Sequence, residues 1–256
     1  MSSQECTLYE NRETIAWITL NRPDARNALS PELVDELYDH LVAANADANV
    51  RAIVIIGAGT AFCAGADLKR TRGSPAGSAK NSYDAVLSAM WNSDKPIIAA
   101  VNGYAFAGGL GLVAASDIVI TSTSAVFSFS EVRIGAIPAM ISVVCLRKIG
   151  THHGMRLFLT GERFDGDQAV NYGLAHRAVA PENLLSAVQE MIDAIRLGGP
   201  NAIVECKKLV RLVPTLSVEE GFRRTKDWSQ RVFQTEEAAE GMKAFAEKRP
   251  PHWVKG

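Results

Sequence analysis

The chain has 256 residues, 47% hydrophobic and 21% charged, which is the composition of an ordinary soluble globular protein. Its 27 lysines and arginines nearly balance 28 aspartates and glutamates, and this net charge of −1 argues against nucleic acid as a main partner. No apolar run approaches the roughly 20 residues that a membrane span needs, so we expect no membrane partner. The four cysteines lack metal-site spacing, and the first residues lack a secretory signal, so we expect a cytoplasmic protein with reduced thiols.

The first two thirds of the chain predict strands that alternate with helices. Residues 13–20 alternate in hydrophobicity as a strand does, and Ser30, Pro31 and Glu32 form the capping signature of a following helix. Three apolar runs then indicate buried strands of a parallel sheet, at 52–57, 96–101 and 117–121. Helical segments are expected at about 78–93, 109–115 and 139–149. Strands that alternate with helices predict an α/β domain.

The pattern changes near Pro181. From there the sequence predicts helices alone, at about 182–197, 199–212, 217–232 and 235–248. We therefore expect residues 1–180 to form the α/β core and residues 181–256 to form a helical C-terminal region.

Two segments place glycine and alanine directly after predicted buried strands, at 60–69 and 102–111. Small residues at the end of a strand let a ligand approach the backbone closely. The carboxyl ends of strands are also where α/β sheets bind ligands. Either segment alone could be a tight turn without a ligand, but the two together predict a binding site.

Both segments resemble motifs of the enoyl-CoA hydratase/isomerase (crotonase) superfamily. Residues 62–69, Phe-Cys-Ala-Gly-Ala-Asp-Leu-Lys, are similar to the family's F-x-A-G-A-D-[LI]-K segment, and residues 102–111 resemble its glycine-rich turn and helix. Residues 20–23 with 27–29, and residues 158–164, match further family motifs, so the resemblance extends over nearly the whole chain. It implies a crotonase-like spiral of strand–strand–helix repeats, followed by a C-terminal helical region that mediates trimerisation. It also implies a homotrimer or a dimer of trimers.

The resemblance further implies an acyl-CoA thioester substrate and an oxyanion hole formed by the backbone N–H groups of Ala66 and Gly108. Two fixed donors stabilise the charge on a thioester enolate oxygen, and losing one such donor typically costs about 2.7–4 kcal/mol. Arg26 is a candidate neighbour of a CoA phosphate or, equally, a solvated charge. No cofactor is expected, because CoA enters as part of the substrate. The residues implied to bind the thioester are Ala64, Ala66, Asp67, Leu68, Lys69 and Gly108.

The sequence departs from the hydratase pattern at one of the family's two catalytic glutamates. Gly111 occupies the position of the first, three residues after Gly108, whereas Glu131 is retained. One glutamate could activate water and then return the proton, as an enoyl-CoA hydratase with Glu131 as general acid/base would require. It could equally shuttle the proton of an enoyl-CoA delta-isomerase. Residues 138–142 resemble the P-A-x-I-S turn of a hydratase branch, and this tips the prediction towards hydratase.

Two other functions are considered. Residues 109–114 fit G-x-G-x-x-A, a dinucleotide fingerprint, but about five residues separate them from the preceding strand, and a Rossmann turn is tighter. A non-catalytic acyl-CoA-binding homologue is the other alternative, because a fold does not fix a function. His152 and His153 have no acid partner at i+4, so no metal site is expected there.

Overall fold

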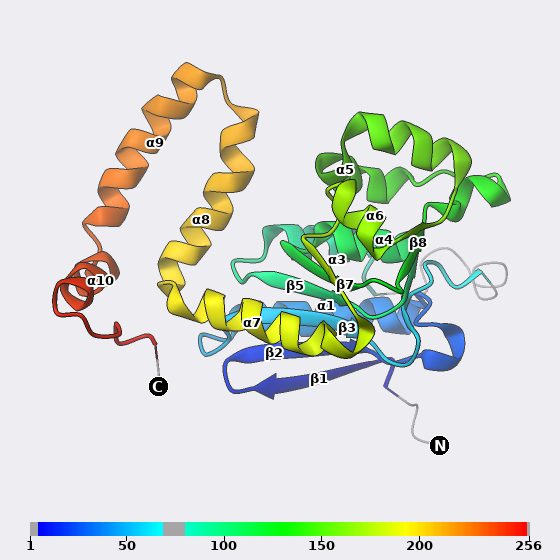
Figure 1. The fold of residues 1–256 in the computed structure, drawn as a ribbon, viewed down its shortest axis with the longest axis horizontal. Helices are drawn as coiled ribbons and strands as arrows, with labels where there is room; N and C mark the ends of the chain where they lie inside the picture. The colour runs from blue at the N-terminus through cyan, green and yellow to red at the C-terminus, as the bar shows by residue number, and fades with distance from the viewer. Residues whose placement is uncertain (1–4, 69–79, 255–256) are drawn as a thin grey trace. The chain divides into compact units, whose positions relative to one another are not determined.

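The computed structural model describes residues 5–68 and 80–254, shown as a ribbon in Figure 1. The chain divides into two compact units, Met1–Val188 and Gln189–Gly256. The division falls within helix α7 (Leu184–Leu197), whereas the sequence placed the change to helices at residue 181. No helix in the described ranges is long and apolar enough to cross a membrane.

A six-stranded sheet with the strand order β1-β2-β3-β5-β7-β10 forms one wall of the first unit. The strands are β1 (Thr7–Arg12), β2 (Ile15–Leu20), β3 (Ala52–Gly57), β5 (Ile97–Val101), β7 (Ile118–Ser122) and β10 (Arg177–Val179). Strands β1 and β2 pair antiparallel, and all the other neighbours pair parallel. Every residue of β5 is buried, as expected for a parallel strand that is covered on both faces. The apolar runs at 52–57, 96–101 and 117–121 thus correspond to the central strands β3, β5 and β7.

A second sheet has the strand order β4-β6-β8-β9. Its strands are β4 (Ala61–Cys63), β6 (Tyr104–Phe106), β8 (Val126–Ser128) and β9 (Phe164–Asp165). Along the chain, β3, β5 and β7 of the first sheet are followed by β4, β6 and β8 of the second, and a helix follows each pair. This confirms the predicted α/β spiral of strand–strand–helix repeats.

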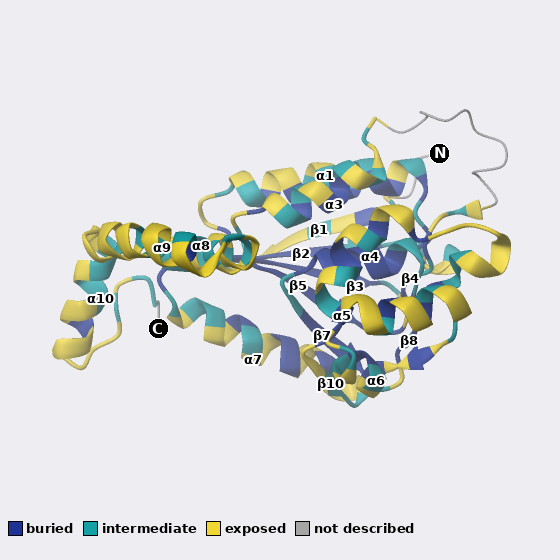
Figure 2. Cartoon of the chain, turned by 90° about the horizontal axis from the view of Figure 1, so that it is seen from above, coloured by how far each residue is buried: buried dark blue, intermediate teal, exposed yellow. Residues whose placement is uncertain are grey.

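The helices of the first unit differ in how far they are buried. They are α1 (Pro31–Ala46), α3 (Tyr83–Asn92), α4 (Gly108–Ala115), α5 (Ala139–Thr160) and α6 (Gly166–Asn171). The Ser30 side chain caps α1 by accepting a hydrogen bond from the N–H of Leu33 at 3.3 Å, as its position predicted. Helices α1 and α3 expose their outer faces, whereas α4 is buried beyond its first residue (Figure 2).

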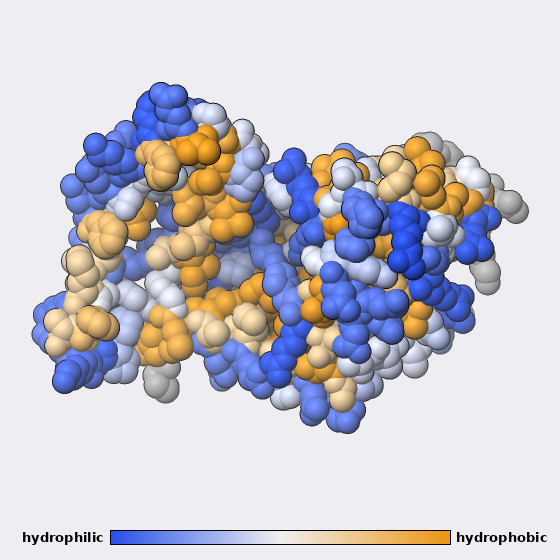
Figure 3. All heavy atoms as spheres, turned by 45° about the horizontal axis from the view of Figure 1, so that its top comes forward, coloured by the Kyte–Doolittle hydropathy of each residue, from blue (hydrophilic) through white to orange (hydrophobic). Residues whose placement is uncertain are grey.

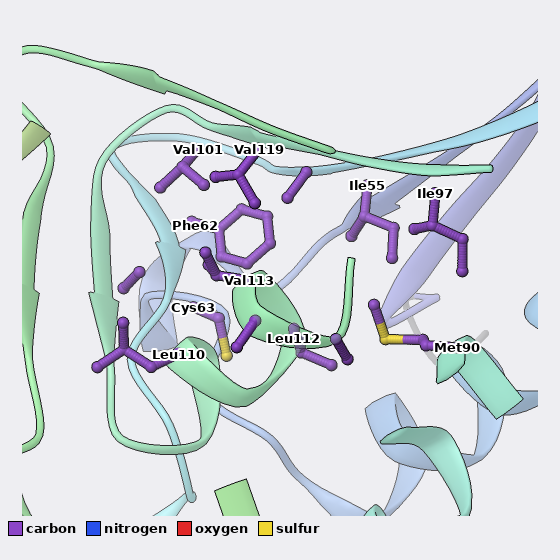
Figure 4. Close-up of a cluster of buried hydrophobic side chains, with 14 of the residues drawn as sticks. Ile55, Phe62, Cys63, Met90, Ile97, Val101, Leu110, Leu112, Val113 and Val119 are labelled. Atoms are coloured by element: carbon purple, nitrogen blue, oxygen red, sulfur yellow. The ribbon is translucent and has the colours of Figure 1, made fainter. Parts of the chain in front are cut away.

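Helix α4 lies in the middle of the hydrophobic core. Figure 4 shows Leu110, Leu112 and Val113 of this helix among side chains from β3, β4, β5, β7 and α3. Phe62 and Met90, which face α4 from two of these elements, are fully buried. The dense packing holds α4 in place and therefore fixes the position of its N-terminal backbone amides.

The second unit contains α8 (Pro200–Leu212), α9 (Val218–Phe233) and α10 (Glu236–Ala246), and its described residues form no strand. The indole N–H of Trp228 donates to the Glu205 carboxylate at 2.6 Å and so links α9 to α8. The Glu237 carboxylate accepts hydrogen bonds from two N–H groups at the start of α8. Large apolar side chains gather on the surface of these helices (Figure 3); the most exposed are Val210, Val218, Phe222 and Phe245.

Candidate active site

The turns that follow β4 and β6 touch at Gly65. This glycine has φ +85°, and a Cβ added to it would lie 2.8 Å from both the Ala107 Cβ and the Phe106 carbonyl oxygen, and 3.1 Å from the Gly108 nitrogen. Any side chain at residue 65 would push the two turns apart. Glycine is therefore required here for its backbone conformation and also for this close approach.

Two backbone N–H groups at this contact have no hydrogen-bond partner among the described residues. Leu29 binds both neighbours of Ala66, because its N–H donates to the Gly65 carbonyl at 2.8 Å and its own carbonyl accepts from Asp67 at 3.2 Å. The N–H of Ala66 donates no hydrogen bond within the described chain. Gly108 is the first residue of α4, so its N–H has no partner within the helix, and no side chain caps it. Ala66 is exposed and Gly108 is half-buried, so a ligand can reach both amides.

Ala107 holds an unusual backbone conformation directly before Gly108, with φ 48° and ψ −120°. A residue with a Cβ in such a region carries strain of order 1–3 kcal/mol. Its N–H donates to the Ser128 carbonyl at 3.0 Å, which ties the start of α4 to the end of β8. Strained residues of this kind cluster at functional sites. Nothing in the sequence signalled this residue, because alanine is not typical of positive φ.

Glu131 lies in the 3-10 turn Ser130–Ile134, which follows β8. Since Ser128 binds Ala107, this turn begins close to the start of α4. One carboxylate oxygen of Glu131, Oε2, is buried and has no hydrogen-bond partner in the described chain. Burial raises the pKa of Glu131, because a charged carboxylate is poorly solvated there. A buried, unpartnered carboxyl group with a raised pKa is a candidate general acid/base.

Tyr83, the first residue of α3, is a site residue that the sequence did not reveal. Its hydroxyl group donates a hydrogen bond to the carbonyl oxygen of Gly108. Burial raises the pKa of Tyr83 well above 10, with further contributions from the charges of Cys63, Cys145 and Glu131. The phenol is therefore protonated, and it lies near enough to Glu131 to experience its charge. The contact joins residues 25 positions apart, which no local pattern reveals.

Of the other predicted binding residues, Ala64, Arg26, Asp67 and Leu68 are among those that the structure describes. The N–H of Ala64 donates to the backbone carbonyl of Arg26 at 3.0 Å, while the exposed Arg26 guanidinium lies 5.9 Å from the centre of the Tyr104 ring. Leu68 is 53% exposed. Lys69 lies outside the described residues.

The Asp67 carboxylate forms an ion pair with Arg22 at 2.9 Å, and both side chains are largely buried. The Arg22 guanidinium also donates to the Ala28 carbonyl. Asn27 is fully buried, and its side-chain N–H groups donate to the carbonyls of Ala58 and Ala61 at 3.0 and 2.7 Å. These contacts fasten residues 22–29 to the turn that carries Ala66.

A groove of about 330 Å³ runs between α3 and α5. Its lining includes Leu87 and Trp91 of α3 and Met140 and Val144 of α5. Apolar side chains line most of it, and Arg147, whose guanidinium lies 5.5 Å from the Trp91 ring centre, borders it. The residues described at 5–68 and 80–254 contain no cluster of His, Cys, Asp and Glu side chains that could hold a metal ion.

The chain is similar to known proteins over nearly its whole length. The model of the family described as enoyl-CoA hydratase/isomerase matches residues 10–256. The carnitinyl-CoA dehydratase of Proteus mirabilis is 34% identical over 250 residues, which cover 94% of this chain and 95% of the relative. The (E)-benzylidenesuccinyl-CoA hydratase of Thauera aromatica is 33% identical over 245 residues, or 93% and 94% of the two chains. A crystal structure of enoyl-CoA hydratase from Mycobacterium smegmatis matches with a TM-score of 0.90 and 30% identity, covering 98% of this chain and all of the other. The chain is therefore an enzyme of the enoyl-CoA hydratase/isomerase family.

Proposed function

We propose that this enzyme adds water across the 2,3 double bond of an acyl-CoA thioester, with Glu131 as its general acid/base. The observation that carries the proposal is the buried carboxylate oxygen of Glu131, which has no hydrogen-bond partner among the described residues. The turn that holds Glu131 follows Ser128, whose carbonyl binds the N–H of Ala107, the residue before Gly108. Two relatives support a reaction that adds or removes water, because one is named carnitinyl-CoA dehydratase and the other (E)-benzylidenesuccinyl-CoA hydratase.

The N–H groups of Ala66 and Gly108 form the proposed oxyanion hole. When water attacks the β-carbon, negative charge collects on the thioester oxygen, and two fixed donors stabilise it with little reorganisation. Each donor is expected to contribute about 2.7–4 kcal/mol to transition-state stabilisation. The positive end of α4 adds to this effect at Gly108.

Glu131 performs both proton transfers in the proposed reaction. Its carboxylate first accepts a proton from water as the water oxygen bonds to the β-carbon. The resulting carboxylic acid then delivers that proton to the α-carbon, and the enolate collapses to the saturated hydroxyacyl thioester. A raised pKa suits this double role, because it brings the pKa of Glu131 closer to neutral pH.

An enoyl-CoA delta-isomerase is the alternative function, and the buried carboxylate of Glu131 supports it as well. A single carboxyl group that takes a proton from one carbon and returns it two carbons away would move the double bond without water. Hydration is favoured because the two named relatives above add or remove water.

The CoA portion is proposed to lie along the turn 64–69. Asp67 contributes through its backbone here, because its carboxylate is engaged by Arg22. Ala64, Leu68 and Lys69 complete the proposed contact with the thioester arm, and Arg26 is placed near a phosphate. The apolar lining of the groove between α3 and α5 suits the hydrocarbon part of the acyl group.

We also propose that the enzyme is a homotrimer or a dimer of trimers. The exposed apolar side chains of α8, α9 and α10, among them Phe222 at 74% and Phe245 at 88%, support an assembly that covers them. Light scattering during size-exclusion chromatography tests this, and a monomer at micromolar concentration would contradict it.

A panel of 2-enoyl-CoA and 3-enoyl-CoA thioesters, analysed by mass spectrometry, tests the reaction. A gain of one water identifies the hydratase, whereas an unchanged mass with a moved double bond identifies the isomerase. The Glu131→Gln variant is the matched control and should bind the thioesters but turn over none of them. Normal turnover by this variant would refute the role of Glu131.

A further inference from the structure

The hydroxyl group of Tyr83 contacts the backbone of α4 at one turn of the helix. It donates a hydrogen bond to the carbonyl oxygen of Gly108. Gly108 is the first residue of α4, so this carbonyl belongs to the first turn of the helix. The Tyr83 hydroxyl group is thus bound to the backbone of that first turn.

Gly111 provides the room for this contact. A Cβ at residue 111 would collide with the Tyr83 hydroxyl oxygen and would lie 2.5 Å from Cγ2 of Ile141. Real Cβ contacts are not this short, so even alanine requires Tyr83 or Ile141 to move. Tyr83 therefore occupies space that a catalytic acid at residue 111 would need, and glycine at this position leaves that space open.

Helix α4 needs such external support. Three of its eight residues are glycine, and each interior glycine lowers helix stability by roughly 0.8–1 kcal/mol relative to alanine. Its first turn also follows the strained Ala107. The Tyr83 ring also packs against the first residue of α4. Its Cε1 atom would lie 3.8 Å from a Cβ added to Gly108, which is an ordinary van der Waals distance.

We propose that Tyr83 is a positioning residue: its hydroxyl group fixes the first turn of α4, and with it the N–H of Gly108, in the space that a second acid at residue 111 would need. The inference rests on the proposed function, because it takes Gly108 as an oxyanion-hole donor. Without the phenol hydroxyl group, the Gly108 carbonyl loses this donor from α3, and the Gly108 amide can shift away from the thioester oxygen.

The Tyr83→Phe variant tests the proposal with a minimal change. Cinnamoyl-CoA serves as the probe, because its conjugated thioester absorbs at longer wavelength when the carbonyl is polarised. We expect kcat to fall at least tenfold, the red shift of bound cinnamoyl-CoA to shrink, and KM to change less than twofold. Tyr38→Phe is the matched control, since Tyr38 packs partly buried against the same core and is expected to leave all three values unchanged.

A double-mutant cycle separates positioning from general destabilisation. Gly111→Ala should lower kcat strongly in the wild-type background but less in the Tyr83→Phe background, because one of the two clashing atoms is then gone. Additive losses in kcat would contradict the paired arrangement. Thermal unfolding of each variant shows whether the measured losses exceed the unfolded fraction.

The possible failures are distinguishable. If wild-type enzyme turns over no enoyl-CoA, or if Glu131→Gln is fully active, the proposed function itself is wrong. If the wild-type enzyme is active and Tyr83→Phe retains its kcat and its full spectral shift, only the role of Tyr83 is refuted. A kcat loss that follows the unfolded fraction would also refute it, because Tyr83 would then be structural alone.

Discussion

Replacing Gly65 with alanine probes the contact that brings the two free amides together. The new methyl group would lie 2.8 Å from the Ala107 Cβ, whereas two carbon atoms pack best at about 3.5–4.0 Å. The turns that follow β4 and β6 must therefore separate by roughly half an ångström or more. Since Gly108 directly follows Ala107, its N–H moves with this separation.

The size of the effect follows from two contributions. A left-handed conformation at φ +85° costs an alanine roughly 1–2 kcal/mol relative to glycine. Overpacking against Ala107 and the Phe106 carbonyl adds about 1–3 kcal/mol. We therefore expect Gly65→Ala to lower the free energy of unfolding by about 2–5 kcal/mol. The displaced amide should lower kcat at least tenfold, because a 1 Å misplacement at a catalytic site costs about 100-fold.

Gly135→Ala is the matched control. Gly135 has the left-handed values φ +74° and ψ 18°, but no atom lies within 4 Å of its Cβ position, so only the backbone cost applies. Urea unfolding and steady-state kinetics with the best substrate of the panel measure both variants. The prediction is wrong if Gly65→Ala is no less stable than Gly135→Ala, or if it keeps the wild-type kcat.

Two further predictions concern charge. Burial raises the pKa of Glu131 in the folded state, so its contribution to stability is present at pH below about 4.5 and is lost as the pH rises through the folded pKa. Glu131→Gln should therefore be more stable than wild type at pH 8 but not at pH 4 in urea unfolding, and an equal difference at both pH values would contradict this. Arg22→Met removes the ion pair that Arg22 forms with the largely buried Asp67 carboxylate and should lower the free energy of unfolding by about 3 kcal/mol. Lys80→Met removes an exposed ion pair with Asp39 and should change little; equal losses would show that burial of the pair does not matter.

Much of the architecture followed from local patterns. Runs such as 52–57 and 96–101 are apolar on both faces, and the structure places them in the middle of a parallel sheet. The capping signature at Ser30 predicted the start of α1, because an N-cap hydrogen bond joins residues that are close in the sequence. The small residues that follow β4 and β6 predicted a ligand-binding site, and the structure shows that these two turns touch each other at Gly65.

Features that depend on distant contacts could not be predicted. The Tyr83 hydroxyl reaches Gly108 only once α3 and α4 are packed, and the sequence around Tyr83 resembles any helix start. The pairing of Asp67 with Arg22 spans 45 residues, so the sequence could not show that this carboxylate is occupied. The missing acid at Gly111 was visible in the sequence, but the Tyr83 and Ile141 side chains that lie beside this glycine were not.

The central claim is that Glu131 alone drives hydration at the amides of Ala66 and Gly108. Incubation with a 2-enoyl-CoA in water labelled with oxygen-18, followed by mass spectrometry, tests it most directly. The account predicts a product that gains one labelled water with the wild-type enzyme and no product with Glu131→Gln, which still binds the thioester. A product of unchanged mass, or labelled product formed by Glu131→Gln at the wild-type rate, would contradict it.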